Sequence, residues 1–265
     1  MGRTFWFQLG SAVAVGLVAA FGVQAAPRPD LVAKVGSGEI AEARLSWWGY
    51  DPVDATKIVE TALASGVRKL IVDRMPSPWM VRPLKGASNQ EILFERGAVV
   101  MAKKGEFHGK SDFLLTYAES TNVVLSGYGA TIAMRIDDYT NKALYAWSEW
   151  RHALTLSGVR NVRVEGLTFD GSGGDGIYFG SAGVGRHCRD VVVRDVTCTR
   201  NNRQGMSVIS AANLLIENCR LVKNNTLDND LLSRLSHFLF EIECCRSHSV
   251  HIFIKSKAFV FGKKA

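Results

Sequence analysis

This chain of 265 residues lacks several features, and each absence excludes a class of protein. It has no run rich in Lys or Arg and no interleaving of aromatic and basic residues, so we expect no nucleic-acid partner. The formal net charge is only +7 while 47% of the residues are hydrophobic, which excludes intrinsic disorder. Only one stretch is long and apolar enough to cross a bilayer, so a multispanning membrane protein is also excluded. One or two globular domains, or a single repeat domain, remain.

The one long apolar stretch lies at the start of the chain. Arg3 is the only charged residue before Arg28, and residues 12–23 are almost all small or aliphatic. A small-x-small pattern of the kind that signal peptidase reads ends at Ala25. We therefore expect residues 1–25 to be a cleaved signal peptide rather than a retained anchor. The mature protein would then be secreted or periplasmic, with no membrane span.

One helix pattern follows a leader segment that we place at residues 26–50. Asp51 is positioned to cap this helix, and Pro52 suits its first turn. Gly66 stands where a left-handed C-terminal cap belongs, so we expect one helix over residues 51–66. Its apolar positions follow helical spacing and are Ala55, Ile58, Val59, Ala62 and Leu63. After this helix the apolar period changes to two, which indicates strands.

The region after the helix repeats itself. Similar segments recur at intervals of 39, 29 and 23 residues, and they begin at Asn122, Asn161, Asp190 and Asn213. Each contains two apolar positions, a turn residue and two more apolar positions; in the last three segments the turn residues are Gly166, Asp195 and Asn218. A second pair of similar segments, residues 176–179 and residues 205–208, is also separated by 29 residues and gives a second register for the repeat. Residues 92–97 form a looser early unit.

Repeats of this length, built from short alternating strands without helices, are typical of a solenoid. A single coil cannot bury its apolar side, whereas stacked coils form a continuous apolar column. Asn, Asp and Gly at the turns suit tight corners because they tolerate unusual backbone angles. We therefore predict an all-β fold, a parallel β-helix over residues 51–225, in which the helix at 51–66 covers the open first coil.

Three stretches also resemble a known group of proteins. They are Gly-Tyr-Gly-Ala-Thr at 127–131, Asn-Val-Arg-Val-Glu-Gly-Leu-Thr-Phe at 161–169 and Ser-Gly-Gly-Asp-Gly-Ile-Tyr at 172–178. They look like the right-handed parallel β-helix proteins of the pectate lyase and polygalacturonase superfamily, over roughly residues 45–225. The resemblance implies a right-handed coil and a polysaccharide partner. It leaves the reaction open, because that superfamily contains lyases, hydrolases, epimerases and binding proteins.

Asp170 and Asp175 lie in a glycine-rich loop and are our candidates for the two catalytic carboxyl groups of a hydrolase, with Asp175 as the acid and Asp170 as the base. Glycosyl hydrolysis uses two carboxyl groups about 5 to 9.5 Å apart, and the glycines would let the backbone approach a ligand. Residues 173–177 resemble the Asn-Thr-Asp-Gly motif of polygalacturonases, with Asp175 at its acid. Two glycines replace the Asn-Thr pair, and the adjacent Asp-Asp pair of that family is absent from the next turn. A plain Gly-Asp turn is the alternative.

Arg203 and Gln204 lie on the next coil. The repeat register stacks Arg203 over Gly174 and Gln204 over Asp175, and a strand spacing of about 4.8 Å lets Arg203 reach the Asp175 carboxylate. Arg203 would bind a sugar carboxylate or tune Asp175 by its charge, so we group it with the two catalytic acids. Gln204 stands where the resemblance places a His, and we assign it to substrate binding. An ordinary ion pair between coils is the alternative for Arg203.

Aromatic rings and a loop histidine complete the predicted substrate-binding set. The rings of Trp147 and Trp150 could stack on sugars, or could simply cover the side of the coil. Tyr178 directly follows the glycine-rich loop. His187 lies in a second glycine-rich loop, where a plainly solvated side chain is the alternative.

Elimination chemistry would need a base near the sugar. The resemblance implies Lys or Arg for that role, and no Lys occurs from residue 143 to residue 222. An arginine would therefore have to abstract the proton, and the candidates are Arg186, Arg200 and Arg203. In such a lyase Arg203 would also neutralise the uronate carboxylate.

We expect no metal ion and no cofactor. The spacing of the tail residues with metal-ligand chemistry matches no usual zinc pattern; they are Cys244, Cys245, His248 and His251. Cys198 and Cys219 occupy inward positions and would behave as small apolar residues. Because they are two residues out of step on adjacent coils, their Cα atoms would lie roughly 8 Å apart, too far for a relaxed disulfide.

The repeat stops at about residue 225. No glycine occurs between Gly205 and Gly262, although the first 205 residues contain 24. Residues 226–265 could form an atypical cap on the solenoid. They could also reflect an altered reading frame, in which case further coils and half of the site would be missing.

Together these features predict an exported, monomeric, carbohydrate-active β-helix protein that acts on a polysaccharide as a hydrolase or a lyase. The positive net charge is compatible with an acidic polysaccharide. Two alternatives stay open at this point: a non-catalytic carbohydrate-binding or surface β-helix, and a truncated inactive copy.

Overall fold

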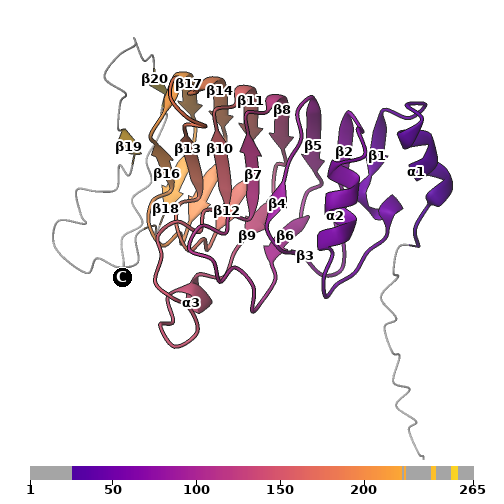
Figure 1. The fold of residues 1–265 in the computed structure, drawn as a ribbon, viewed down its shortest axis with the longest axis horizontal. Helices are drawn as coiled ribbons and strands as arrows, with labels where there is room; N and C mark the ends of the chain where they lie inside the picture. The colour runs from indigo at the N-terminus through magenta and orange to yellow at the C-terminus, as the bar shows by residue number, and fades with distance from the viewer. Residues whose placement is uncertain (1–25, 223, 225–239, 243–251, 256–265) are drawn as a thin grey trace, which may run out of the picture.

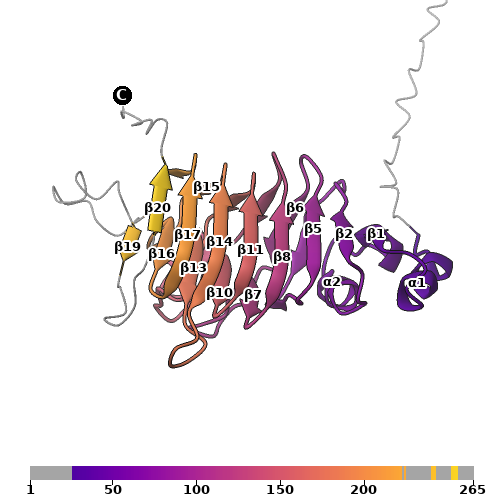
Figure 2. The ribbon, with the colours of Figure 1, turned by 90° about the horizontal axis from the view of Figure 1, so that it is seen from above.

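The computed structural model describes residues 26–222, residue 224 and two short strands at residues 240–242 and 252–255. Short strands wind into successive coils that stack along one axis, with helices at the N-terminal end (Figures 1 and 2). The predicted signal peptide at residues 1–25 and the cysteines and histidines of the tail lie outside the described residues. In the part of the chain that is described, no helix is long and apolar enough to span a membrane.

The strands form three parallel sheets, and each complete coil contributes one strand to each sheet. The first sheet contains, in order, β1 (Glu42–Arg44), β2 (Lys69–Val72), β5 (Gln90–Phe94), β8 (Thr121–Ser126), β11 (Arg160–Glu165), β14 (Cys188–Arg194), β17 (Ala211–Glu217) and β20 (Ile252–Lys255). The second contains β4 (Leu84–Lys85), β7 (Leu115–Ala118), β10 (Leu154–Ser157), β13 (Ile177–Gly180), β16 (Met206–Val208) and β19 (Phe240–Ile242). The third contains β3 (Trp79–Val81), β6 (Val99–Ala102), β9 (Thr131–Ala133), β12 (Thr168–Asp170), β15 (Thr197–Thr199) and β18 (Arg220–Val222).

The strand register confirms the repeat that the sequence predicts. Val162 pairs with Val123 on one side and Val191 on the other, and Val191 pairs with Leu214. These four side chains point inward and are completely buried, so they form one column of the apolar core. The prediction of an all-β parallel β-helix is therefore confirmed.

Polar residues near the start of the first-sheet strands stand at one corner of successive coils. They are Asn89, Asn122, Asn161, Asp190 and Asn213, and all have positive φ angles between 51° and 58°. Asn and Asp tolerate this left-handed conformation better than other side chains do. The Asn122 amide donates to Asn89 at 2.8 Å, and the Asn161 amide donates to Asn122 at 2.8 Å. Side-chain hydrogen bonds thus link neighbouring coils at this corner.

The N-terminal end carries more structure than we expected. Within the predicted leader, α1 (Pro29–Gly36) and β1 form, and the 3-10 helix η1 (Leu45–Trp48) follows. The expected helix at 51–66 is wrong in extent, because α2 covers only Thr56–Leu63. Asp51 does not cap it; its carboxylate accepts the main-chain N–H groups of Val53 and Asp54 in a turn before the helix. Gly66 has the predicted left-handed conformation, with φ of +79°.

Helix α2 covers the first coil as predicted. It packs against η1, β3 and β4 and lies beside β1 and β2 at the end of the stack (Figure 1). Its Val59, Ala62 and Leu63 are buried in the same core cluster as the coil interior. The open end of the solenoid is therefore closed by an apolar helix face, which hides core side chains from water.

A long insertion interrupts the regular coil between β9 and β10. It comprises residues 134–153, contains the short helix α3 (Ile136–Tyr139) and projects from the side of the stack in Figure 1. This insertion explains why the spacing between Asn122 and Asn161 is the longest of the three intervals. It also brings new side chains to the corner that holds the candidate site.

At the other end, two further strands extend the second and first sheets. β19 pairs with β16, and β20 pairs with β17, both in parallel. Most of residues 226–265 lies outside the described residues, so the predicted cap or altered frame stays a prediction.

The described cysteines behave as small core residues. Cys198 is completely buried and pairs with Leu221 on the next coil rather than with Cys219. Cys188, Cys198 and Cys219 are all free thiols. The prediction that Cys198 and Cys219 form no disulfide is therefore confirmed.

Candidate functional site

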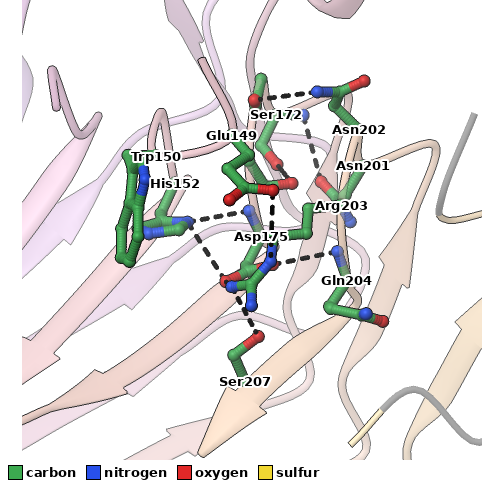
Figure 3. Close-up of polar contacts among 12 residues, drawn as sticks. Glu149, Trp150, His152, Ser172, Asp175, Asn201, Asn202, Arg203, Gln204 and Ser207 are labelled. Carbon is green, nitrogen blue, oxygen red and sulfur yellow. Dashed lines mark hydrogen bonds and ion pairs between the residues drawn. The ribbon is translucent and has the colours of Figure 1, made fainter. Parts of the chain in front are cut away.

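The candidate site lies where two successive coils turn from the third sheet into the second. Asp175 belongs to the turn from β12 into β13, and Arg203 and Gln204 belong to the equivalent turn from β15 into β16. The end of the insertion, with Glu149 and His152, lies beside both turns (Figure 3). Residues far apart in the sequence therefore meet at one corner of the coil.

Main-chain hydrogen bonds hold the two turns in register. The Asn202 N–H donates to the Ser172 carbonyl at 2.9 Å, and the Arg203 N–H donates to the Gly174 carbonyl at 3.0 Å. The Ser172 N–H donates in turn to the Asn201 side chain at 3.1 Å. The predicted stacking of Arg203 over Gly174 is therefore confirmed.

Asp175 is completely buried beneath the second turn. Its Oδ1 accepts the main-chain N–H of Gln204 at 2.9 Å, and its Oδ2 accepts from Nη1 of Arg203 at 3.1 Å. The hydroxyl of Ser207 also donates to this carboxylate. The contact between Arg203 and Asp175 that the sequence predicts is thus present, together with two further donors.

Burial decides the charge state of Asp175. Removal of the carboxyl group from water raises its pKa to about 6, because the charged form loses its hydration. The Arg203 cation, Ser207 and the Gln204 N–H act in the opposite direction and only partly offset this effect. Asp175 therefore titrates near neutrality, as proton donors in enzymes commonly do.

Arg203 bridges two carboxylates. Its Nε lies 3.8 Å from Oε2 of Glu149, while its Nη1 contacts Asp175 at 3.1 Å. These distances across the planar guanidinium allow the two carboxylate oxygens to be at most about 9 Å apart, which does not exceed the upper end of the range for glycosidase acid pairs. The guanidinium also lies 5.9 Å from the ring centroid of Trp150, which is 43% exposed. Glu149 is 38% exposed and Arg203 only 19%.

His152 is a completely buried neighbour of Asp175. Its Nδ1 accepts the main-chain N–H of Asp175 at 2.8 Å and lies 3.4 Å from the Asp175 carboxylate. Its ring is stacked between Tyr178 at 4.7 Å and Phe113 at 5.4 Å, with Trp150 at its edge. Burial, and then the Arg203 charge, lower the pKa of His152 to about 3, so the imidazole is neutral at ordinary pH.

The glycine-rich loop is shaped to fit the insertion. A Cβ atom on Gly174 would lie 2.5 Å from the Glu149 carbonyl and 2.8 Å from Nδ1 of His152. A Cβ atom on Gly173 would lie 2.9 Å from the ring of Tyr139. The expectation that these glycines admit a ligand is therefore wrong at both positions, because the chain's own insertion fills the space.

Arg151 fixes the insertion to the body of the coil. It is completely buried, and its guanidinium donates to the carbonyls of Phe107 at 2.8 Å, Ala146 at 3.0 Å and His108 at 3.3 Å. The rings of two tyrosines flank this cation; they are Tyr139 at 5.7 Å and Tyr145 at 5.6 Å. Because Arg151 lies between Trp150 and His152, these contacts set the position of both neighbours.

The family described as right handed beta helix region matches residues 108–253, which include every residue of this site. The chain belongs to this family. It is a right-handed parallel β-helix of the pectate lyase-like superfamily, as its sequence motifs predict.

Three solved structures share this β-helix at 14% sequence identity. A candidate glycosyl hydrolase from Parabacteroides merdae ATCC 43184 has a TM-score of 0.59 over 84% of this chain and 100% of its own. An iota-carrageenase complexed to iota-carrageenan fragments has a TM-score of 0.53 over 81% of this chain and 48% of its own. An iota-carrageenase from A. fortis has a TM-score of 0.55 over 80% of this chain and 46% of its own. At this identity the likeness shows the fold alone.

One curated protein is also similar. The SPbeta prophage-derived protein YorA of Bacillus subtilis (strain 168) is 27% identical over 148 residues. The match covers 51% of this chain and 24% of YorA, so the β-helix protein described here spans about a quarter of that relative.

The remaining predicted site residues of this β-helix lie in different surroundings. Asp170 forms a two-pronged ion pair with Arg200, at 2.8 and 2.6 Å, instead of contacting the Asp175 cluster. Nδ1 of His187 contacts the Ser210 hydroxyl at 2.6 Å. Trp147 is 52% exposed on the insertion. Gln204 contributes its main chain to Asp175, and its side-chain Oε1 is buried without a partner among the described residues.

The arginines considered as bases for elimination are all paired with carboxylates. Arg186 pairs with Glu119, Arg200 with Asp170, and Arg203 with Asp175 and Glu149. The Asp170 partner raises the pKa of Arg200 further above its ordinary value. An arginine held in its charged form is a poor base, so this arrangement does not favour elimination.

Sequence reasoning missed Glu149, His152 and Ser207. Glu149 and His152 belong to the insertion, which follows no repeat, so the register could not place them. Ser207 was visible in principle, because it lies one strand spacing from Tyr178 in the predicted second register. Among the described residues, no group of three or more His, Cys, Asp or Glu side chains is placed to hold a metal ion.

Proposed function

We propose that this protein is a polysaccharide hydrolase in which Asp175 donates a proton to the glycosidic oxygen and Glu149 is the second carboxylate. The observation that carries the proposal is the pair of carboxylates held across one guanidinium, beside the exposed ring of Trp150. Trp150 would stack on a sugar ring, and the outer rim of the site would also include Tyr178. Glu149 replaces Asp170 in this role because the Asp170 carboxylate is occupied by Arg200.

Hydrolysis is preferred over elimination for two reasons. The arginines near the site are paired with carboxylates, whereas Asp175 has a pKa of about 6 that suits a general acid. Arg203 already faces two carboxylates, so its charge does not require an acidic sugar. The substrate panel should therefore contain neutral as well as acidic polysaccharides.

A non-catalytic carbohydrate-binding role is the second candidate, and one observation favours it. The Asp175 carboxylate is completely buried, so a sugar would reach it only after Arg203 and Glu149 move aside. In a binding protein, Asp175 would simply hold Arg203 beneath the Trp150 platform.

Turnover and binding measurements on the same variants separate these functions. We expect the wild-type protein to release reducing ends from one polysaccharide of the panel without forming an unsaturated, ultraviolet-absorbing product. Asp175→Asn should lower turnover about 100- to 10,000-fold, the usual contribution of a general acid, while retaining binding. Trp150→Ala should weaken binding by removing the stacking platform.

Further variants test whether Glu149 or Asp170 is the second catalytic carboxylate. Glu149→Gln should reduce turnover as strongly as Asp175→Asn, whereas a larger loss in Asp170→Asn would return the second role to Asp170. Asp190→Asn, at a corner remote from these side chains, should leave turnover unchanged. Wild-type binding without any release of reducing ends would favour the carbohydrate-binding function.

We also propose that the protein is exported. The support is the apolar run at residues 12–23 and the small-x-small pattern that ends at Ala25. N-terminal sequencing of protein recovered from the periplasm or medium should begin after Ala25. Recovery of the full-length chain in the cytoplasm alone would contradict export.

A further inference from the structure

We propose that His152 is a positioning residue for Asp175. The neutral imidazole of His152 presents its Nδ1 lone pair to the main-chain N–H and the carboxyl group of Asp175, and thereby favours the protonated form of that carboxyl group. This inference deepens the proposed hydrolase function and rests on it, because a proton donor must hold its proton before it reacts.

The tautomer of His152 follows from its hydrogen bond. A main-chain N–H can only donate, so the 2.8 Å contact from the Asp175 N–H requires an unprotonated Nδ1. The ring proton therefore lies on Nε2, which is buried and has no hydrogen-bond partner among the described residues. The charged form would place a proton on Nδ1 against the Asp175 N–H, and the burial of the ring disfavours that charge as well.

Stacking fixes the orientation of the imidazole. The His152 ring is nearly parallel to Tyr178 and Phe113, with interplanar angles of 4° and 11°. The edge of Trp150 closes a further side at 5.9 Å. With its ring held on both faces, His152 keeps Nδ1 directed at Asp175 (Figure 3).

The lone pair on Nδ1 lies 3.4 Å from Oδ2 of Asp175. Two acceptors at this distance repel each other when Asp175 is ionised, whereas a protonated carboxyl group presents no negative charge to the lone pair. His152 therefore acts in the same direction as burial, which raises the pKa of Asp175.

Other groups also face Asp175, and the effect of His152 on the carboxyl group has to be distinguished from theirs. Arg203 and the Gln204 N–H come from the turn before β16, Ser207 comes from β16, and all three stabilise the carboxylate. The Cys198 thiol faces it from β15, and Glu149 of the insertion acts through Arg203. Unlike these groups, the Nδ1 lone pair of His152 is a neutral acceptor, and it disfavours the ionised form of the Asp175 carboxyl group.

Two substitutions separate the acceptor from the ring. His152→Phe keeps an aromatic ring between Tyr178 and Phe113 but removes the acceptor. His152→Asn loses the stacking but keeps an amide oxygen close to the position of Nδ1. The readout is the titration of the Asp175 carboxyl carbon by NMR in the full chain, which needs no substrate. Failure of the hydrolase proposal would therefore not affect this measurement.

We expect the Asp175 pKa to fall by about one unit in His152→Phe and to stay near the wild-type value in His152→Asn. A value in His152→Phe equal to that of the wild type would overturn the proposal. An equal fall in both variants would also overturn it, because stacking and not the acceptor would then be responsible.

A measurement on the wild-type protein keeps the proposal testable if His152→Phe does not fold. The nitrogen chemical shifts of His152 should report an unprotonated Nδ1 and a protonated Nε2 between about pH 5 and pH 8. A protonated Nδ1 in this range would overturn the proposal.

Discussion

At the scale of single residues, Asp175 combines complete burial with an ion pair to Arg203. The attraction of Arg203 lowers the energy of the carboxylate, but the loss of water outweighs it and the pKa rises to about 6. A carboxyl group of this kind disfavours the folded state once it ionises. Such a cost is typical of a functional site and unusual for an ion pair that serves stability.

This cost predicts how stability depends on pH. The folded pKa of Asp175 is raised from 3.8 to about 6, so its contribution is fully present below about pH 4 and is lost as the pH rises through 6. The unfolding free energy of the wild type, relative to Asp175→Asn, should therefore fall by at most about 3 kcal/mol over this interval. Denaturant unfolding of both proteins at several pH values measures it. A wild type that gains stability over the variant with rising pH would contradict the assignment.

At the scale of structural elements, the corner ladder shows how side chains link neighbouring coils. Asn122 and Asn161 each donate an amide N–H to the coil before, and Asn213 donates to Asp190 at 2.9 Å. Asp190 is opposite Asn161 in the register, but a carboxylate has no hydrogen to donate. The ladder is therefore broken at one step, between Asn161 and Asp190.

Asp190→Asn should close this step. The new amide can donate to Asn161, and Asn tolerates the positive φ of 56° at this position. We expect a gain of about 0.5–1 kcal/mol in the free energy of unfolding, measured with denaturant. Asn122→Asp is the matched control, because it removes the donor to Asn89 and should cost a similar amount. A loss of stability in Asp190→Asn would show that the carboxylate has a role of its own at this corner.

At the scale of the whole molecule, a solenoid depends on its ends, because each coil contacts only its neighbours. Asp54 fastens the capping helix to the stack: its carboxylate accepts from Lys103 at 2.6 Å, from Arg82 at 3.1 Å and from the start of α2 at Thr56. Burial acts to raise the pKa of Asp54, but the hydrogen bonds from Lys103 and Thr56 outweigh it and hold this pKa well below its usual range.

Asp54→Ala should therefore loosen one end of the solenoid and leave the middle intact. We expect faster hydrogen exchange in α2 and β2, with unchanged protection in β11 and β14. Glu60→Ala is the control, since its carboxylate is on the exposed face of α2 and, among the residues that the structure describes, forms an ion pair only with Lys57, at 3.8 Å. Equal loss of protection along the whole coil would show that the domain unfolds as a single cooperative unit.

Part of the candidate site was predictable from the sequence. The register placed Arg203 over Gly174 and Gln204 over Asp175, so their contact followed from a fixed strand spacing. The partner of Asp170 could not be predicted this way, because Arg200 reaches it through a long side chain that a backbone register does not direct. Glu149 and His152 could not be found at all, since the insertion has no repeat to align.

The sequence by itself determined the coil: recurring polar turn residues and an inward apolar column require stacking, whatever the details of each side chain. Only the tertiary structure decided which groups meet Asp175. Its surroundings depend on an irregular insertion, fixed by the buried Arg151 and fitted against glycines that lack a side chain. Burial by that insertion and by the neighbouring turn also sets the charge state of Asp175, and burial is a property of the folded molecule that no local pattern encodes.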